Sequence, residues 1–150
     1  MEQQNTFLMP PAVRIQLVRE SQERYEVSSA PDVYKIASEY LKNEDREHLI
    51  VLLLDTAGRV NGIHTVSIGD SNSSIANPRE IFKAAILTNS CSIILAHNHP
   101  TGNCEPSLAD ITVTEKVIEA GKILDIEVLD HVVVGHNCHF SMRKQQTVKF

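Results

Sequence analysis

The sequence predicts an α/β protein of the α+β type, in which helices flank a mixed, mainly antiparallel sheet. Short apolar runs with the length of buried strands alternate along the chain with segments of helical periodicity. The turn Asp-Thr-Ala-Gly at residues 55–58 separates two strand patterns, as in an antiparallel hairpin. No GxGxxG or Walker-type glycine loop occurs, which argues against a doubly wound nucleotide-binding fold.

The chain length sets the domain organisation. Its 150 residues suffice for one compact domain and leave little room for a second. We expect a loose lead-in over residues 1–11 and a single domain over residues 12–150. Alternating apolar residues predict a first strand over residues 13–17, and Pro31 then opens a helix. The apolar face of this helix comprises Val33, Ile36, Ala37, Tyr40 and Leu41.

A hairpin and a capped helix follow in the middle of the chain. The unbroken apolar run at residues 49–54 predicts a strand buried on both faces, and residues 60–68 form its antiparallel return. The run Asn77-Pro78-Arg79-Glu80 supplies a cap, a proline at the first helical position and an acid three residues after the cap. These signals start a helix over residues 81–87, with Glu80 as a capping-box acid.

The second half of the chain repeats the alternation of strand and helix. Residues 92–96 read as a buried strand that delivers His97 at its end. A loop rich in Asn, Pro and Gly covers residues 98–106, a helix is expected over residues 108–124, and a strand over residues 126–134.

Composition and charge narrow the classes of function. Apolar residues make up 42% and charged residues 22% of the chain, as in a folded globular protein. The net charge of −5 argues against nonspecific coating of nucleic acid, which needs clustered Lys and Arg. Three cysteines without a CxxC pair fit a reducing compartment. Because the chain shows neither a secretory signal nor a membrane-spanning run, we expect a cytoplasmic protein without membrane contact.

The informative stretch is His97-Asn98-His99-Pro100, followed by Ser107 and Asp110. Two histidines at i and i+2 at the end of a strand point to the same side, so their imidazoles can converge on one ion. Asp110, in the first turn of the next helix, can return as a third ligand. Two His and one carboxylate occur in catalytic zinc sites, where water takes the fourth position. A second interpretation needs no metal, because Ser107 to Asp110 is also a capping box.

With these residues together, the sequence resembles a known family. The pattern from His97 to Asp110 looks like the JAMM metalloprotease motif of MPN-domain deubiquitinases. More closely, the segment from Pro78 to Val132 resembles the RadC family of JAMM-like proteins. The resemblance covers roughly residues 30 to 140 and implies the JAMM/MPN architecture, which is related to cytidine deaminase. The chain is similar to a short form that lacks the helix-hairpin-helix segment of long members.

The resemblance also implies roles for individual residues. His97, His99 and Asp110 would be the zinc ligands, and Ser107 would hydrogen-bond the oxyanion of an attacked amide. A glutamate would serve as the general base that activates water. We favour Glu47, because it directly precedes the buried strand where JAMM proteins place this residue. Glu80 is the rival, although its place in a capping box already explains it.

These roles predict a zinc-dependent hydrolase, most plainly a metallopeptidase or amidase that acts on a peptide or protein. The alternative is a DNA-repair-associated binding module in which the metal site is structural or vestigial. Asn98 stands where peptidase members usually carry Ser or Thr, so hydrolysis of isopeptide bonds is an extrapolation. Direct nucleic-acid binding and the oligomeric state stay open, with a homo-oligomer among the alternatives.

Several other side chains have two interpretations. Cys104 lies in the loop between the ligands and is either a metal contact or incidental. His136, Cys138 and His139 could form a second soft-ligand cluster, although a turn without metal is favoured. His131 follows Asp130 in a strand pattern and is expected to orient or pack near the site rather than to bind zinc.

Overall fold

The computed structural model describes residues 25–69 and 77–150. In chain order, its elements are α1 (Ala30–Tyr40), β1 (His48–Leu54), β2 (Val60–Ile68), α2 (Pro78–Leu87), β3 (Ser92–Asn98), α3 (Leu108–Leu124), β4 (Glu127–Val134) and β5 (His139–Ser141). The predicted lead-in over residues 1–11 and the strand predicted over residues 13–17 lie outside the described residues. The predicted order of the remaining helices and strands is confirmed.

The five strands form one sheet in the order β2-β1-β3-β4-β5. β1 pairs antiparallel with both β2 and β3, and β4 pairs antiparallel with β5. Only β3 and β4 run parallel within this sheet, and α3 connects them. A parallel pair requires such a crossover, whereas short turns join the antiparallel pairs β1–β2 and β4–β5. The predicted mixed, mainly antiparallel sheet is therefore confirmed.

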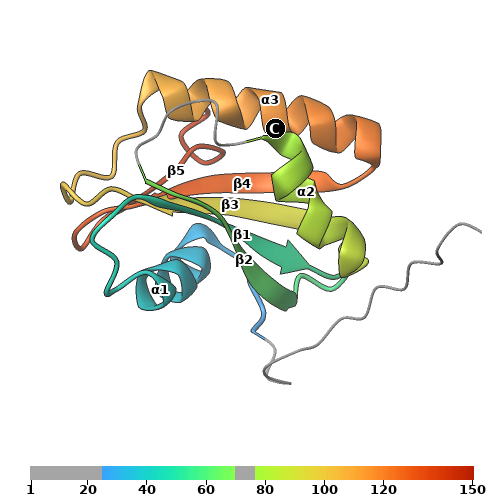
Figure 1. The fold of residues 1–150 in the computed structure, drawn as a ribbon, viewed down its shortest axis with the longest axis horizontal. Coiled ribbons are helices and arrows are strands. Elements are labelled where there is room, and N and C mark those ends of the chain that lie inside the picture. Colours follow the sequence, from blue (N-terminus) through green and yellow to red (C-terminus); the bar gives the residue numbers. More distant parts are fainter. Residues whose placement is uncertain (1–24, 70–76) are drawn as a thin grey trace, which may run out of the picture.

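Helices cover both faces of the sheet, which makes three layers (Figure 1). α1 packs on one face against β3, β4 and β5, while α2 and α3 cover the other face. β1 and β3 lie inside the sheet and are buried along their whole length. Their side chains alternate between two apolar clusters, with Leu49 and Leu95 on the α2/α3 side and Ile50 and Ala96 on the α1 side. A strand buried on both faces explains the continuous apolar run at residues 49–54.

The structure departs from the predicted elements in four places. β3 continues to Asn98, so His97 lies inside the strand rather than at its end. β5 was not predicted, because three residues are too short for a periodic pattern. Tyr40 is 47% exposed and its hydroxyl bonds Thr65, so it does not join the buried face of α1. The predicted capping box of α2 is not formed: Asn77 accepts from the Arg79 N–H, while the Glu80 carboxylate pairs with Lys83.

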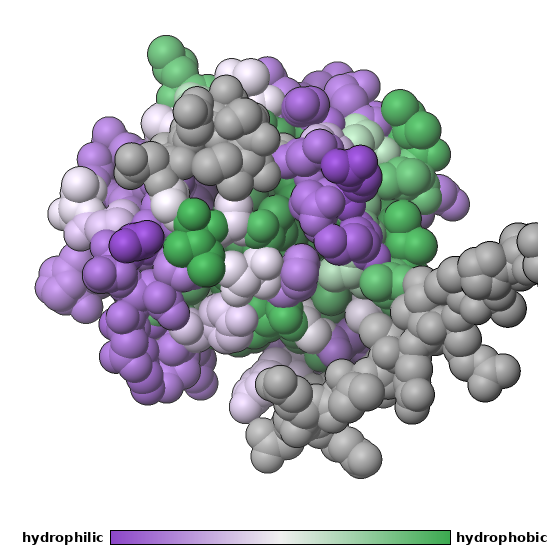
Figure 2. Space-filling view, in the orientation of Figure 1, coloured by the Kyte–Doolittle hydropathy of each residue, from purple (hydrophilic) through white to green (hydrophobic). Residues whose placement is uncertain are grey.

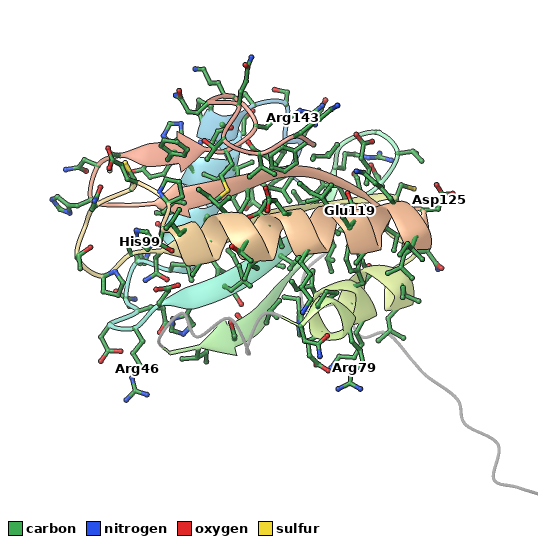
Figure 3. All side chains as sticks on the ribbon, turned by 90° about the horizontal axis from the view of Figure 1, so that it is seen from above. Arg46, Arg79, His99, Glu119, Asp125 and Arg143 are labelled. Atoms are coloured by element: carbon green, nitrogen blue, oxygen red, sulfur yellow. The ribbon has the colours of Figure 1, made fainter. Side chains whose placement is uncertain are left out.

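The two ends of α3 have different surroundings. His99 lies beside its N-terminal end and Asp125 at its C-terminal end (Figure 3). Figure 2 shows apolar atoms gathered at the right of the molecule, where the C-terminal ends of α2 and α3 lie in Figure 1. The exposed apolar side chains of those two helix ends are Ile86, Ile123 and Leu124. Among the described residues, no helix is both long and apolar enough to cross a bilayer.

Candidate metal centre

The three predicted ligands come together at one end of the sheet. β3 delivers His97 and, directly after its last residue, His99, while the first turn of α3 delivers Asp110. Their ligand atoms all lie within 4.8 Å of one another, the only such group of three or more His, Cys, Asp or Glu within residues 25–69 and 77–150. The Nε2 atoms of His97 and His99 are 2.9 Å apart. Asp110 Oδ1 lies 3.4 Å from His97 Nε2, and Asp110 Oδ2 lies 3.5 Å from His99 Nε2.

A chain of hydrogen bonds behind His97 fixes its tautomer. The Thr114 hydroxyl lies 2.6 Å from the Asp110 carbonyl oxygen and must donate to it, because a carbonyl only accepts. His131 Nδ1, 2.6 Å from the same hydroxyl, must therefore carry a proton and donate. His131 Nε2 then accepts from His97 Nδ1 at 2.8 Å. The relay leaves the Nε2 lone pair of His97 directed toward His99 and Asp110.

His99 is oriented in the same way by a backbone group. Its Nδ1 lies 2.9 Å from the carbonyl oxygen of Asn103, which requires an Nδ1–H donor and leaves an Nε2 lone pair. Metal-bound histidines almost always donate their other ring N–H to such a partner. Two lone pairs and a carboxylate that face each other repel unless a metal ion or protons lie among them. The arrangement therefore fits a bound cation.

The pKa shifts in the site reflect the same demand for positive charge. Burial opposes ionisation of Asp110, but in the metal-free protein protons on the facing Nε2 atoms allow His97 and His99 to donate hydrogen bonds to it, and these bonds hold the pKa of this carboxyl well below its usual range. The hydrogen bond to Asp110 raises the pKa of His99 despite the opposing effect of burial. Burial, and then the nearby His97, lower the pKa of His131 well below its usual range. An uncharged His131 is what the relay requires.

The donor set and its spacing suit zinc. Tetrahedral zinc with bonds of about 2.0–2.1 Å places its nitrogen and oxygen ligands roughly 3.3 Å apart. The three separations in the structure run from 2.9 to 3.5 Å. Zinc, copper, iron and nickel all accept imidazole, so the group could hold any of these metal ions.

Ser107 forms the capping box of α3 and contacts the predicted ligand Asp110 at the same time. Its hydroxyl accepts from the Asp110 N–H at 3.1 Å, and its own N–H donates to Asp110 Oδ2 at 2.7 Å. The hydroxyl also donates to Asp110 Oδ2 at 2.7 Å. Both interpretations of the Ser107–Asp110 pair are thus compatible, because the cap holds the carboxylate in the orientation that a ligand needs. A role of Ser107 toward an oxyanion stays a prediction.

Glu47 lies at the same end of the sheet as the ligands. It is the half-buried residue directly before β1, and its negative charge contributes to the raised pKa of His99, after the larger effect of Asp110. Its rival Glu80 is at the start of α2, where Lys83 and the hydrogen bond from it lower the pKa of the carboxyl. The structure brings Glu47 toward His99, and its role as a base stays a prediction.

Comparison with known proteins decides the family. The family model of the RadC-like JAB domain matches residues 27–147 of this chain. The chain belongs to this family. The resemblance found in the sequence is thereby confirmed, and the His97–His99–Asp110 group of this RadC-like JAB domain could hold a metal ion, as in JAMM domains.

Relatives of this RadC-like JAB domain carry uninformative names. The chain is 42% identical over 123 residues to a UPF0758 protein of Methanosarcina mazei, covering 82% of this chain and 54% of that protein. A UPF0758 protein of Caldanaerobacter subterraneus is 43% identical over 123 residues, with 82% and 53% covered. One of Rubrobacter xylanophilus is 48% identical over 118 residues, with 79% and 52% covered. The chain spans about half the length of these relatives.

The remaining candidate ligands of the RadC-like JAB domain are not assembled into a second site. Cys104 is not in the metal group; a hydrogen bond with Cys138, reinforced by burial, raises the pKa of its thiol. His139 belongs to β5 and stacks on Tyr34, with ring centroids 5.0 Å apart. Within the described part of the chain, the soft-ligand cluster that also includes His136 is therefore not formed.

His131 is the residue whose importance the sequence only partly disclosed. It was expected to orient or pack near the site, and the structure gives it a defined contact with His97. Asp130, its neighbour, faces the opposite side of β4 and accepts from the Ser141 hydroxyl at 2.6 Å and the Arg143 N–H at 3.0 Å. The period-2 alternation of a strand is the signal that separates these two roles.

Proposed function

We propose that this chain is a zinc-dependent hydrolase that cleaves amide bonds in a peptide or protein, in the manner of a metallopeptidase. One observation carries the proposal: two imidazole lone pairs and a carboxylate converge, each oriented from behind by a hydrogen bond. Such support is typical of a site that holds a metal rather than of an incidental histidine pair. Two His and one carboxylate is also a donor set of catalytic zinc, which keeps one position open.

Zinc in such a site lowers the pKa of a water molecule toward neutrality and polarises the carbonyl under attack. The residues of the chain supply the remaining chemistry. Glu47 would take a proton from the water and return it to the nitrogen of the leaving amine. This step needs a carboxylate beside the ligands, and Glu47 directly precedes β1, the strand that pairs with β3.

Ser107 would hydrogen-bond the oxyanion of the tetrahedral intermediate. In the structure its hydroxyl proton is directed at Asp110 Oδ2. To serve the substrate, the hydroxyl turns from this carboxylate oxygen to the developing negative charge, while its backbone N–H keeps the bond to Asp110. A donor aimed at an oxyanion contributes roughly 10²–10³ in turnover.

The proposal is tested by incubating the zinc-loaded protein with a defined peptide mixture and identifying new termini by mass spectrometry. The wild type is expected to generate new termini that a chelator abolishes. Glu47→Gln should retain zinc and lose cleavage, whereas the control Glu80→Gln should cleave normally. Absence of cleavage by a wild type that holds one zinc per chain would contradict the proposal, as would normal cleavage by Glu47→Gln.

A further inference from the structure

The carboxamide of Asn98 bridges two strands at the edge of the candidate site. Asn98 is the last residue of β3 and is 8% exposed. Its Oδ1 accepts from the backbone N–H of His48 at 2.8 Å. Its Nδ2 donates to the backbone carbonyl of Arg46 at 2.9 Å. One side chain therefore holds the two peptide groups that flank Glu47.

The register of the sheet shows how this bridge relates Glu47 to the predicted metal ligands. β1 and β3 pair antiparallel with Leu49 opposite His97, and continuing this register places Glu47 opposite His99. Opposite residues of an antiparallel pair share a face of the sheet, so Glu47 and His99 belong to the same side. The side chain of Asn98, one residue away from His99, points to the other side and hydrogen-bonds the backbone on both sides of Glu47. Figure 3 shows Arg46 and His99 at the same end of the molecule.

The position of the bridge is also where the regular ladder ends. β1 begins at His48, and its described pairing with β3 begins with Leu49 opposite His97. On the side that faces β3, Asn98 supplies the Glu47 segment with both an acceptor and a donor. A second support comes from the His48 ring, whose Nδ1 donates to the same Arg46 carbonyl at 3.0 Å. On the other flank, the Glu47 carbonyl accepts from the Gly69 N–H at 2.9 Å.

We propose that Asn98 is a positioning residue that holds Glu47 beside the metal ligands through its bridge between the Arg46 carbonyl and the His48 N–H. The inference rests on the proposed function, because it presumes that Glu47 serves the metal site. The Asn98 bridge joins the strand that carries the ligands and the segment that carries the base into one rigid unit. Misplacement of a catalytic group by about 1 Å costs up to roughly 10²-fold in rate, so such a bridge matters for function beyond its effect on folding.

The test uses the cobalt-substituted protein, whose visible spectrum reports the surroundings of the metal without a substrate. The spectrum is recorded as a function of pH. The pH at the midpoint of the spectral change is then compared in wild type, Asn98→Ala, Glu47→Gln and the double variant. Removal of the Glu47 charge is expected to lower the midpoint by about one pH unit. Asn98→Ala should lower it by at least half as much, and the double variant should match Glu47→Gln alone.

Hydrogen exchange and a control variant separate positioning from general destabilisation. Exchange of the His48 N–H should accelerate at least tenfold in Asn98→Ala. The control is Asn77→Ala, which removes another asparagine that caps a backbone N–H, at the start of α2; it should leave the midpoint unchanged. Asn98→Ser replaces Asn98→Ala if circular dichroism shows that the alanine variant does not fold.

Each other outcome has a distinct meaning. A midpoint at the wild-type value in Asn98→Ala, together with a shift in Glu47→Gln, would overturn the positioning role and leave the proposed function intact. Unchanged exchange of the His48 N–H would overturn the bridge itself. No shift in Glu47→Gln, or no binding of cobalt at all, would contradict the proposed function and the inference with it.

Discussion

The Nδ1 atom of His97 lies 2.8 Å from the Nε2 atom of His131, which joins a predicted metal ligand to a fully buried, uncharged imidazole of the neighbouring strand. His131 in turn donates to Thr114, and Thr114 donates to the backbone of Asp110, another predicted ligand. The relay thus connects two predicted ligands. Because each hydrogen bond in the relay has only one allowed direction, the relay leaves the lone pair of His97 on the nitrogen that faces His99 and Asp110.

Truncation of the relay should weaken metal binding without removing a ligand. Thr114→Val leaves the Nδ1–H of His131 without its acceptor, so we expect zinc affinity to fall about 10- to 100-fold. The protein should also lose roughly 1–3 kcal/mol of stability, because buried polar groups lose their partner. Competition with a chromophoric chelator measures the affinity, and urea unfolding the stability.

The chain offers a matched control for this variant. Thr112 makes the same bond to the carbonyl four residues earlier, but on the exposed side of α3. Thr112→Val should therefore leave zinc affinity at the wild-type value. Equal losses in the two variants would show that the relay does not act on the metal.

Zinc affinity should depend on pH through His99. The pKa of His99 is raised in the metal-free protein by the hydrogen bond to Asp110, so a proton occupies this ring to higher pH than usual. Zinc must displace this proton. We expect the apparent affinity to rise about tenfold per pH unit below the raised pKa and to level off above it. Chelator competition at several pH values measures this slope, and an affinity that is flat from pH 6 to 8 would contradict it.

The pKa shifts of His99 and Asp110 also determine how the stability of the metal-free protein depends on pH. The contribution of His99 is fully present below the unfolded pKa, near 6.5, and is lost as the pH rises through its higher folded pKa. The contribution of Asp110 is present above the unfolded pKa, near 3.8, and is lost as the pH falls below it. Urea unfolding at several pH values should thus show the greatest stability of the metal-free chain between pH 3.8 and pH 6.5. Addition of zinc should extend this range of high stability to higher pH.

Ser107→Ala should affect stability and turnover to different degrees. Loss of the cap of α3 costs about 1 kcal/mol, measured by urea unfolding. If Ser107 also serves the oxyanion, turnover of a cleaved peptide should fall roughly 10²–10³-fold. Asn77→Ala removes the cap of α2 and should match the loss of stability while it leaves turnover unchanged. Equal turnover in both variants would restrict Ser107 to the cap.

Gly121→Ala tests how α3 is held against the sheet. A Cβ at this position would lie 2.6 Å from the Ile126 carbonyl oxygen and 3.0 Å from Val128 Cγ2. Although alanine favours a helix by up to about 1 kcal/mol, this contact should make the variant less stable by roughly 1–3 kcal/mol. Gly62→Ala on β2 meets only an ordinary contact at 3.8 Å and should be tolerated. Urea unfolding compares the two, and a more stable Gly121→Ala would contradict the packing.

The sequence predicted those features that depend on local pattern. The helix at Leu108–Leu124 was predicted with its observed bounds, because Ser107 and Asp110 form a complete capping box at its start. The continuous apolar run identified β1 as a strand covered on both faces. The spacing of His97, His99 and Asp110 also suffices to predict their convergence, since all three lie on one strand end and the helix that follows it.

Contacts that depend on the pairing of distant strands could not be predicted in the same way. The relay needs the parallel register of β3 and β4, which places His131 opposite Leu95. The Asn98 bridge needs the antiparallel register of β1 and β3, so the sequence showed Asn98 only as a departure from peptidase members. Glu80 has the spacing of a capping-box acid, but its carboxylate accepts a hydrogen bond from Lys83, one turn away, instead.

The zinc content of the purified protein is the decisive measurement for the proposed metal centre. The chain is purified without a metal-binding tag and measured by elemental analysis beside His99→Ala, in which one of the three ligands is missing. We expect about one zinc per wild-type chain and its loss in the variant. A wild type that holds no metal, even after reconstitution with zinc, would rule out the proposed zinc site and favour the alternative of a DNA-associated module with a vestigial site.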